Sequence, residues 1–369
     1  MTHVEEVARR LAQLDAGEVE CIPWAEVRER LREKHRVKAE EGTRHNMRHR
    51  IIEQDGETLL KIETPDWRAE LVLSLGANLT RLTHLASGLD ILRFPPSMAE
   101  LREKPEVWGI PALFPPNRID AGRFAMDGRS YAFPVNDVER GNHMHGFLSR
   151  RPWELGTARE SSVTALFRHG PERDSFAYFP HKFRFELSYE FAPNLVTQRA
   201  KVVNLGPEPM PFGLGFHTAF RLPFGPATPE ALAQCNVKVA MERRSWEVSD
   251  RILPTGASLP LPPDQDWPGE GVNPSGKAIS LHAPAAAGRS AILESPADRA
   301  RVVYTVDDAF GHWMLWNHGG GKAFFCPEPM TWMVDAPNLK LPPAVTGLRS
   351  LGPGGGRTLV SSIGVSTKA

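Results

Sequence analysis

Two histidines and one glutamate stand in unusual local sequences, and their side chains are suited to proton transfer. His145 is followed by Gly146, His217 ends an apolar segment that contains two glycines, and Glu328 lies between two prolines. Imidazole and carboxyl groups often act as general acids and bases in enzymes. A proton donor and a proton acceptor on rigid backbone would supply such catalysis if the fold brings them together.

The local sequence of Glu328 predicts a carboxyl group with a raised pKa. Pro327 and Pro329 remove two backbone donors and fix two φ angles, which is an uncommon setting for a surface glutamate. Phe325 and Trp332 make the surroundings apolar. Such surroundings disfavour the charged carboxylate, so its pKa rises toward the range that suits a general base.

The two glycines before His217 have two explanations. Gly213 and Gly215 would weaken a strand, and glycines inside strands usually mark a bulge or the close approach of a ligand. A core histidine with a hydrogen-bonded partner explains His217 equally well.

His143 and His145 form a His-x-His pair, which could bind a metal as in cupins. The next acidic residue is Glu154, which is too distant for the usual cupin spacing. We therefore expect no metal site, and we interpret His143 as a hydrogen-bonded strand residue.

Asn117 and Arg118 lie in a proline-rich segment that we expect to be extended and to expose its neighbours. The planar guanidinium of Arg118 could bind two adjacent oxygen atoms of a ligand. The alternative is an ordinary ion pair between Arg118 and a surface carboxylate.

Composition excludes several classes of function. The chain has 369 residues, with 44 basic and 44 acidic side chains, so no net charge attracts nucleic acid or an anionic membrane. Three scattered cysteines are too few for a disulfide framework. The sequence shows neither a signal peptide nor an apolar stretch long enough to span a bilayer. We expect a soluble cytoplasmic protein, monomeric or dimeric, that binds a small neutral ligand.

Two regions of different character follow each other along the chain. Residues 1–48 contain apolar residues at helical spacing among charged ones, which predicts a short helical extension. From residue 49 the pattern alternates with period two, as in 182–191, and Asp55-Gly56 predicts a hairpin turn. With 33 prolines and 31 glycines but few helical patterns, residues 49–369 predict a large antiparallel β-sandwich. Residues 259–276 read as a long surface loop.

The segments around these residues resemble those of the aldose 1-epimerase (galactose mutarotase) family, from about residue 49 to the C-terminus. The resemblance rests on short motifs in the order of the family. They are Asn117-Arg118-Ile119, His145-Gly146, Tyr178-Phe179-Pro180, Val203-Asn204-Leu205-Gly206 leading to Gly215-Phe216-His217, Glu328-Pro329-Met330-Thr331 and Asp335-Ala336-Pro337-Asn338.

The resemblance implies a β-supersandwich that interconverts the α and β anomers of an aldohexose without cofactor or metal. It implies that Glu328 takes the proton of the C1 hydroxyl and that His217 protonates the ring oxygen. Arg118, His145 and Asn117 would bind sugar oxygens, with Arg118 and His145 stabilising charge as the ring opens.

The chain departs from the family pattern at two points. Thr218-Ala219-Phe220 follows His217 where the family usually has proline and an aromatic residue. The sugar-binding aspartate of well-known members has no clear match, although Asp264 and Asp266 lie in the right region. Four aromatic residues are candidates for stacking on a sugar: Trp108, Phe114, Phe147 and Trp332.

Two alternatives within this fold remain. A hexose-6-phosphate 1-epimerase would need additional cations, which Arg150 and Arg151 could supply. A non-catalytic carbohydrate-binding domain would have no need for a matched acid and base.

The N-terminal region has a resemblance of its own. Ala8-Arg9-Arg10-Leu11 and Ile22-Pro23-Trp24 look like segments of short addiction-module components. A charged helical appendage explains the same residues equally well.

Overall fold

Antiparallel sheets contain most of the regular secondary structure in residues 47–367, the part of the chain that the computed structural model describes. An eight-stranded sheet has the order β11-β12-β13-β14-β27-β23-β22-β18. A five-stranded sheet contains β1 to β5 in sequence order, and a third sheet runs β21-β24-β25-β16-β6, with β17 also paired to β25. The predicted β-sandwich is therefore confirmed. The predicted N-terminal extension, residues 1–48, lies outside the described residues apart from its last two.

The bounds of the elements are as follows. The eight-stranded sheet contains β11 (Glu154–Ala158), β12 (Ser162–His169), β13 (Phe183–Ala192), β14 (Leu195–Asn204), β27 (Gly356–Thr367), β23 (Ala300–Val306), β22 (Ser290–Ser295) and β18 (Asn236–Val239). The five-stranded sheet contains β1 (Arg48–Gln54), β2 (Glu57–Glu63), β3 (Trp67–Val72), β4 (Asn78–His84) and β5 (Leu89–Asp90). The third sheet contains β21 (Ser280–Pro284), β24 (His312–Trp316), β25 (Phe324–Met330), β16 (Gly215–Phe216), β6 (Ala112–Leu113) and β17 (Phe220–Arg221).

Two-stranded ribbons and short helices complete the described part. The ribbons pair β7 (Arg118–Asp120) with β10 (Asn142–Met144), β8 (Arg123–Met126) with β9 (Arg129–Ala132), β15 (Met210–Pro211) with β26 (Ser350–Leu351), and β19 (Arg244–Val248) with β20 (Pro254–Pro260). The α-helices are α3 (Met98–Glu103), α4 (Pro229–Gln234) and α5 (Pro343–Thr346). The 3-10 helices are η1 (Pro105–Val107), η2 (Leu148–Arg150), η3 (Asp174–Ala177), η4 (Pro296–Asp298) and η5 (Ala336–Asn338). None of the helices in residues 47–367 is long and apolar enough to cross a membrane.

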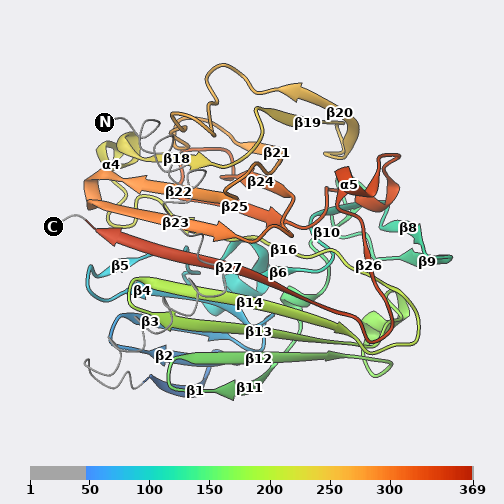
Figure 1. The fold of residues 1–369 in the computed structure, drawn as a ribbon. Coiled ribbons are helices and arrows are strands. Elements are labelled where there is room, and N and C mark those ends of the chain that lie inside the picture. The colour runs from blue at the N-terminus through green and yellow to red at the C-terminus, as the bar shows by residue number, and fades with distance from the viewer. Residues whose placement is uncertain (1–46, 368–369) are drawn as a thin grey trace, which may run out of the picture. The chain divides into compact units, whose positions relative to one another are not determined.

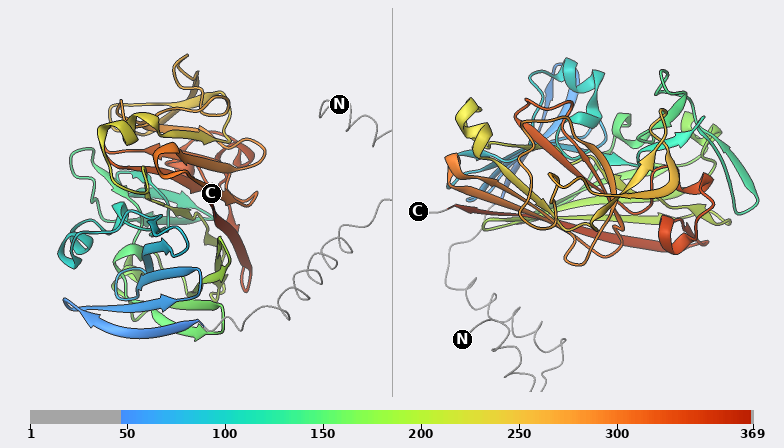
Figure 2. Two further views of the ribbon diagram at one scale, coloured as in Figure 1. Left: turned by 90° about the vertical axis from the view of Figure 1, so that its left-hand side faces the viewer. Right: turned by 90° about the horizontal axis from the view of Figure 1, so that it is seen from above.

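The sheets are arranged in layers. The eight-stranded sheet runs across the front in Figure 1, and the view from above in Figure 2 shows the other two sheets behind it. Apolar side chains of all three sheets form one large buried cluster. Because burial of apolar surface is the main favourable term in folding, this shared core fixes the layers against one another.

The strand and the hairpin predicted from the period-two pattern are both present. Buried and partly exposed residues alternate along nearly the whole of β13, as expected for a strand with one face on the core. At the predicted hairpin, Asp55 and Gly56 both have positive φ between β1 and β2, which is the geometry of a tight type I′ turn.

The predicted surface loop, residues 259–276, is only partly correct. β20 extends to Pro260, and Trp267 is fully buried, with its ring stacked 5.5 Å from that of Phe325. Val272 is also buried and pairs with Val237. The high content of proline, glycine and aspartate predicted a loop, but Trp267 and Val272 are core residues that anchor this segment.

Gly146 allows the chain to cross closely over β6. It has a φ of +67° and forms a bridge with Phe114, and a Cβ at this position would lie 2.1 Å from the Phe114 carbonyl oxygen. No flexible side chain could move to relieve that contact. Gly88 has a similar φ of +70°, but a Cβ there would have nothing within 4 Å.

These two glycines give a matched test of the packing. We expect Gly88→Ala to lower the free energy of unfolding by about 1–2 kcal/mol, the cost of a left-handed residue. Gly146→Ala should cost about 1–3 kcal/mol more, because of the added overpacking. Urea unfolding of both variants measures the difference, and equal losses would contradict the close approach at Gly146.

Candidate active site

A gap in the hydrogen bonding of β25 creates the site. β24 pairs with β25 from Cys326 to Met330, whereas on the other side β16 and β17 pair only with the two ends of β25. Residues two apart in a strand direct their N–H groups to the same side. Pro327 and Pro329, which lack N–H groups, therefore fit a strand that has no partner on one side at this point.

His217 and Glu328 face each other across this gap. His217 lies between β16 and β17, and its Nε2 is 3.3 Å from Oε1 of Glu328. Both side chains are buried, with 4% and 2% of their surfaces exposed. The edge of Trp316 packs against the His217 ring, with 5.4 Å between ring centroids. The predicted acid and base are thus in contact.

Burial moves the pKa values of the pair in opposite directions. It raises the pKa of Glu328 well above its usual value, and the positive charge of Arg118 partly opposes this rise. It lowers the pKa of His217 to about 4, and the charge of Arg93 adds to this effect. Both shifts favour the neutral forms, which are a protonated carboxyl group and an unprotonated imidazole.

Arg118 is held by a buried aspartate. Its Nε donates to Oδ2 of Asp137 at 2.8 Å, and Arg140 donates to the same carboxylate. Burial alone would raise the pKa of Asp137, but the hydrogen bonds and charges of Arg118 and Arg140 lower it. The terminal nitrogens of Arg118 have no hydrogen bond to any described residue and remain available to a ligand.

Asn117 connects the segments that carry the site residues. Its φ is +53°, so the prediction of extended backbone is wrong at this residue. Its carbonyl accepts the His145 N–H at 2.8 Å, and its Oδ1 accepts the Arg118 N–H at 3.0 Å. Asp335 donates its own N–H to the Arg118 carbonyl at 2.9 Å. The left-handed turn at Asn117 thus fixes the start of β7.

His145 lies beside His217, with 5.4 Å between their ring centroids. Burial, together with the nearby His217 and Arg118, lowers the pKa of His145 well below its usual value. Its Nδ1 has no hydrogen-bond partner in the described part of the chain. A neutral imidazole with a free nitrogen can bind a hydroxyl group.

These side chains line one cavity of about 530 Å³. The cavity contains all five predicted site residues: Asn117, Arg118, His145, His217 and Glu328. Sequence reasoning missed several others in its wall, namely Lys104, Glu106, Met144, Ser280, Met314 and Trp316.

The aromatic residue in the cavity was not among the four candidates for sugar stacking. Phe114, Phe147 and Trp332 are buried in the cores, and Arg93 lies over the ring of Trp108. Trp316, at the end of β24, lines the cavity instead. No signal in the local sequence indicated this, because Trp316 ends a strand of mostly apolar residues.

The glycines before His217 serve internal packing. A Cβ on Gly213 would lie 2.3 Å from the Trp332 ring, and one on Gly215 would lie 2.9 Å from Pro116. The structure therefore offers no support for the approach of a ligand at these glycines.

Other candidates lie outside the cavity. His143 Nδ1 donates to the Pro134 carbonyl at 2.7 Å, which confirms it as a hydrogen-bonded strand residue. Asp264 pairs with Lys277 and Asp266 with Arg243, so neither aspartate reaches the site. Within residues 47–367, no group of three or more histidine, cysteine and acidic side chains is arranged to hold a metal ion.

The two adjacent arginines have different surroundings. Arg150 lines the cavity, but its guanidinium donates to Glu106 and to the carbonyls of Arg102 and Glu103. Arg151 pairs with Asp174 at 2.6 Å and does not line the cavity.

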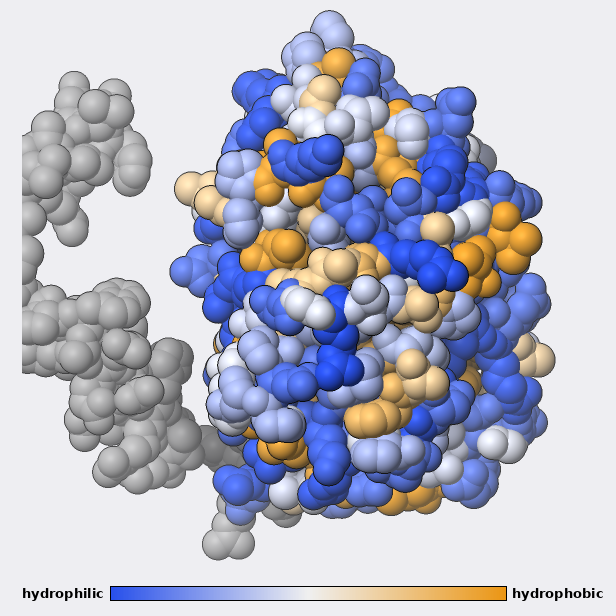
Figure 3. All heavy atoms as spheres, turned by 90° about the vertical axis from the view of Figure 1, so that its right-hand side faces the viewer, coloured by the Kyte–Doolittle hydropathy of each residue, from blue (hydrophilic) through white to orange (hydrophobic). Residues whose placement is uncertain are grey.

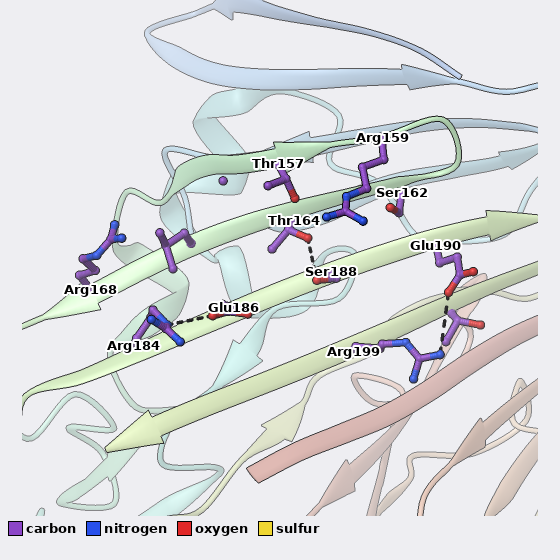
Figure 4. A pocket seen from close by; sticks show the side chains of 13 residues that line it. Thr157, Arg159, Ser162, Thr164, Arg168, Arg184, Glu186, Ser188, Glu190 and Arg199 are labelled. Atoms are coloured by element: carbon purple, nitrogen blue, oxygen red, sulfur yellow. Dashed lines mark hydrogen bonds and ion pairs between the residues drawn. The ribbon is translucent and has the colours of Figure 1, made fainter. Parts of the chain in front are cut away.

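A hollow of about 570 Å³ over β11 to β14 lacks the features of a reaction site (Figure 4). Its charged residues largely pair with each other, as Arg184 does with Glu186 at 2.8 Å. Arg199 likewise lies 3.8 Å from Glu190. This is an ordinary solvated strand face.

Figure 3 shows another face, on which hydrophobic residues lie in small groups among hydrophilic ones.

Solved structures share this fold. A galactose mutarotase-like protein from Clostridium acetobutylicum is 29% identical, with a TM-score of 0.82 over 89% of this chain and 100% of that chain. The galactose 1-epimerase of Lactobacillus acidophilus is 14% identical, with a TM-score of 0.68 over 88% of this chain and 100% of that chain, which shows the fold alone.

Comparisons of sequence agree with this fold. The uncharacterized Escherichia coli protein YphB is 25% identical over 255 residues, which are 68% of this chain and 80% of that protein. Residues 1–27 match the model of a family of addiction module components. Residues 59–348 match the aldose 1-epimerase model. The chain therefore belongs to the aldose 1-epimerase family.

Proposed function

We propose that this protein is an aldose 1-epimerase (mutarotase) that interconverts the α and β anomers of an aldohexose. The observation that carries the proposal is the buried contact between His217 and Glu328 at the wall of a cavity of sugar size. A binding protein has no need to bury two groups that exchange protons, because burial of an ionisable group costs free energy.

Ring opening needs two coupled proton transfers. The Glu328 carboxylate takes the proton of the C1 hydroxyl, and the protonated His217 gives its proton to the ring oxygen. The bond between C1 and the ring oxygen breaks, and C1 becomes an aldehyde carbon. After rotation about the bond between C1 and C2, the same pair runs in reverse and closes the ring on the other face. No proton is lost or gained overall.

The reactive form of the pair is the one with the proton on His217. The raised pKa of Glu328 and the lowered pKa of His217 favour the proton on the carboxyl group, so it must cross the 3.3 Å contact to reach His217. Arg118 favours this transfer because its charge lowers the pKa of Glu328. A sugar hydroxyl that donates to the carboxylate would act in the same direction.

The remaining residues bind and orient the sugar. Arg118 has terminal nitrogens free for two adjacent sugar oxygens, and Asp137 holds its Nε. The His145 ring lines the cavity, and a neutral imidazole can bind a hydroxyl group. Asn117 lines the cavity and supports both neighbours through its carbonyl and amide oxygens.

A hexose 6-phosphate is the second candidate substrate. Lys104 and Arg150 line the cavity and would attract a phosphate, although Arg150 is already bound to Glu106. Competition between glucose and glucose 6-phosphate in the assay below decides between these substrates.

The first prediction concerns the reaction itself. We expect the protein to accelerate mutarotation of freshly dissolved α-D-glucose or α-D-galactose, followed by polarimetry. Glu328→Gln should reduce the enzymatic rate by about 100- to 10,000-fold, because the amide cannot accept the C1 proton.

Glu190→Gln is the matched control, because Glu190 lies on β13 beside Arg199, outside the cavity. It should retain the full rate. A folded protein that accelerates neither sugar would contradict an unphosphorylated aldose as substrate. Failure on glucose 6-phosphate as well would favour the non-catalytic binding domain.

The second prediction concerns stability. The pKa of Glu328 is raised in the folded state, so the protein loses stability as pH rises above the unfolded pKa of the carboxyl group. Glu328→Gln removes this loss and should raise the free energy of unfolding at pH 8 by about 0.5–2 kcal/mol. Below pH 4.5 the two proteins should differ little. Thermal unfolding at both pH values measures this, and a less stable variant at pH 8 would oppose the assigned pKa shift.

The third prediction concerns the pH dependence of the rate. The pKa of His217 is lowered to about 4, so the pair takes up a second proton only near that pH. After subtraction of spontaneous mutarotation, kcat/KM should not fall as the pH is lowered from 7.5 to 5.5, and it should fall toward pH 4. A fall with a midpoint near 6.5 would show an ordinary histidine and would contradict the burial argument.

A further inference from the structure

The cavity over Glu328 continues into a second pocket of about 330 Å³. Four residues belong to the walls of both cavities: Asn117, Arg118, Ser280 and Met314. Glu328 and His217 line only the first cavity. The volume lies at the lower end of the range for small-molecule sites, so the pocket suits a group of single-ring size.

The second pocket follows the first along one face of the sheet. Met314 of β24 is the partner of Glu328 on one side and of His282 of β21 on the other. Residues directly opposite each other point to the same face. Neighbouring strands are about 4.8 Å apart, so Glu328 and His282 are separated by about 10 Å. Two linked pyranose rings cover such a span.

Polar groups without partners surround the second pocket. His282 is 3% exposed, and neither of its ring nitrogens has a hydrogen-bond partner in residues 47–367. The indole N–H of Trp246, whose ring lies 6.5 Å from that of His282, is also unpaired there. Buried polar groups are nearly always hydrogen-bonded in proteins, and both side chains line the pocket, so a ligand hydroxyl that reached these buried atoms would complete their hydrogen bonding.

The hairpin β19–β20 supplies an apolar wall to the same pocket. Val248 and Leu259 line it and are 42% and 48% exposed, although both are large apolar side chains. The hairpin stands at the upper edge of the sheets in Figure 1. A pocket with both an apolar wall and unpaired polar groups matches a sugar ring, which has apolar C–H faces and a rim of hydroxyls.

We propose that this second pocket binds the second residue of a reducing disaccharide or oligosaccharide, whose reducing-end aldose lies over Glu328 and His217. The inference rests on the proposed mutarotase function. Ring opening requires a free C1 hydroxyl at Glu328, so the second residue must be joined through another carbon. The position of the pocket beyond Arg118 and Met314, away from Glu328, meets this requirement.

The test compares mutarotation of glucose with that of disaccharides that carry glucose at the reducing end. Maltose, cellobiose and lactose present 1→4 linkages, and melibiose presents a 1→6 linkage. At least one of them should have a KM about tenfold lower than that of glucose. The linkage of the preferred sugar then identifies the carbon that points to the second pocket.

Leu259→Asp tests the pocket wall without disturbing the core, because this side chain is half exposed. It should raise the KM of the preferred disaccharide about tenfold and leave the KM of glucose unchanged. Leu205→Asp is the control, since Leu205 is 52% exposed and lies in neither cavity.

The outcomes separate the two proposals. Active protein that shows no disaccharide preference, or a preference that Leu259→Asp does not change, overturns the second subsite and leaves the mutarotase function intact. Inactivity toward glucose and every disaccharide overturns both.

Discussion

The site depends on one constraint: the middle of β25 lies inside a sheet but must have no hydrogen-bonded partner strand on one side. Backbone donors left unpaired in such a place would cost free energy. Pro327 and Pro329 have no donors, so β25 can leave the gap open while β24 holds its other edge. Glu328 then faces His217 instead of a neighbouring strand. The same two prolines thus explain both the gap and the burial of the carboxyl group.

The position of Arg118 depends on backbone contacts more than on its own strand. Left-handed conformations at Asn117, His145 and Asp335 turn three chain segments toward one another, and backbone hydrogen bonds link them. Asparagine and aspartate tolerate this conformation better than most residues do. Asp137 then fixes the guanidinium. Arg118 is paired with Asp137 and not with Glu328, and its charge lowers the pKa of the Glu328 carboxyl group without a direct contact.

Sequence reasoning found the residues with distinctive local chemistry. Glu328 was predicted from its prolines and His145 from its glycine, and alternation predicted strands such as β13. The meeting of His145, His217 and Glu328 could not be read from local sequence, because it depends on which strands pair; the family resemblance supplied it. Trp316 was missed for a different reason: a tryptophan in an apolar strand has the pattern of a core residue. Asp137 was missed because its partner lies 19 residues away.

In the proposed mechanism, reaction and specificity come from different parts of this fold. Glu328 and His217 are placed by the central sheet, where neighbouring strands restrict movement on most sides. Part of the wall of the second pocket comes from the hairpin β19–β20, where Val248 and Leu259 are 42% and 48% exposed. Changes on such a hairpin alter which sugars fit without moving the proton-transfer pair, because its exposed positions contribute little to stability. If both proposals hold, substrate range can vary independently of the reaction, and differences in sugar preference should arise at the hairpin.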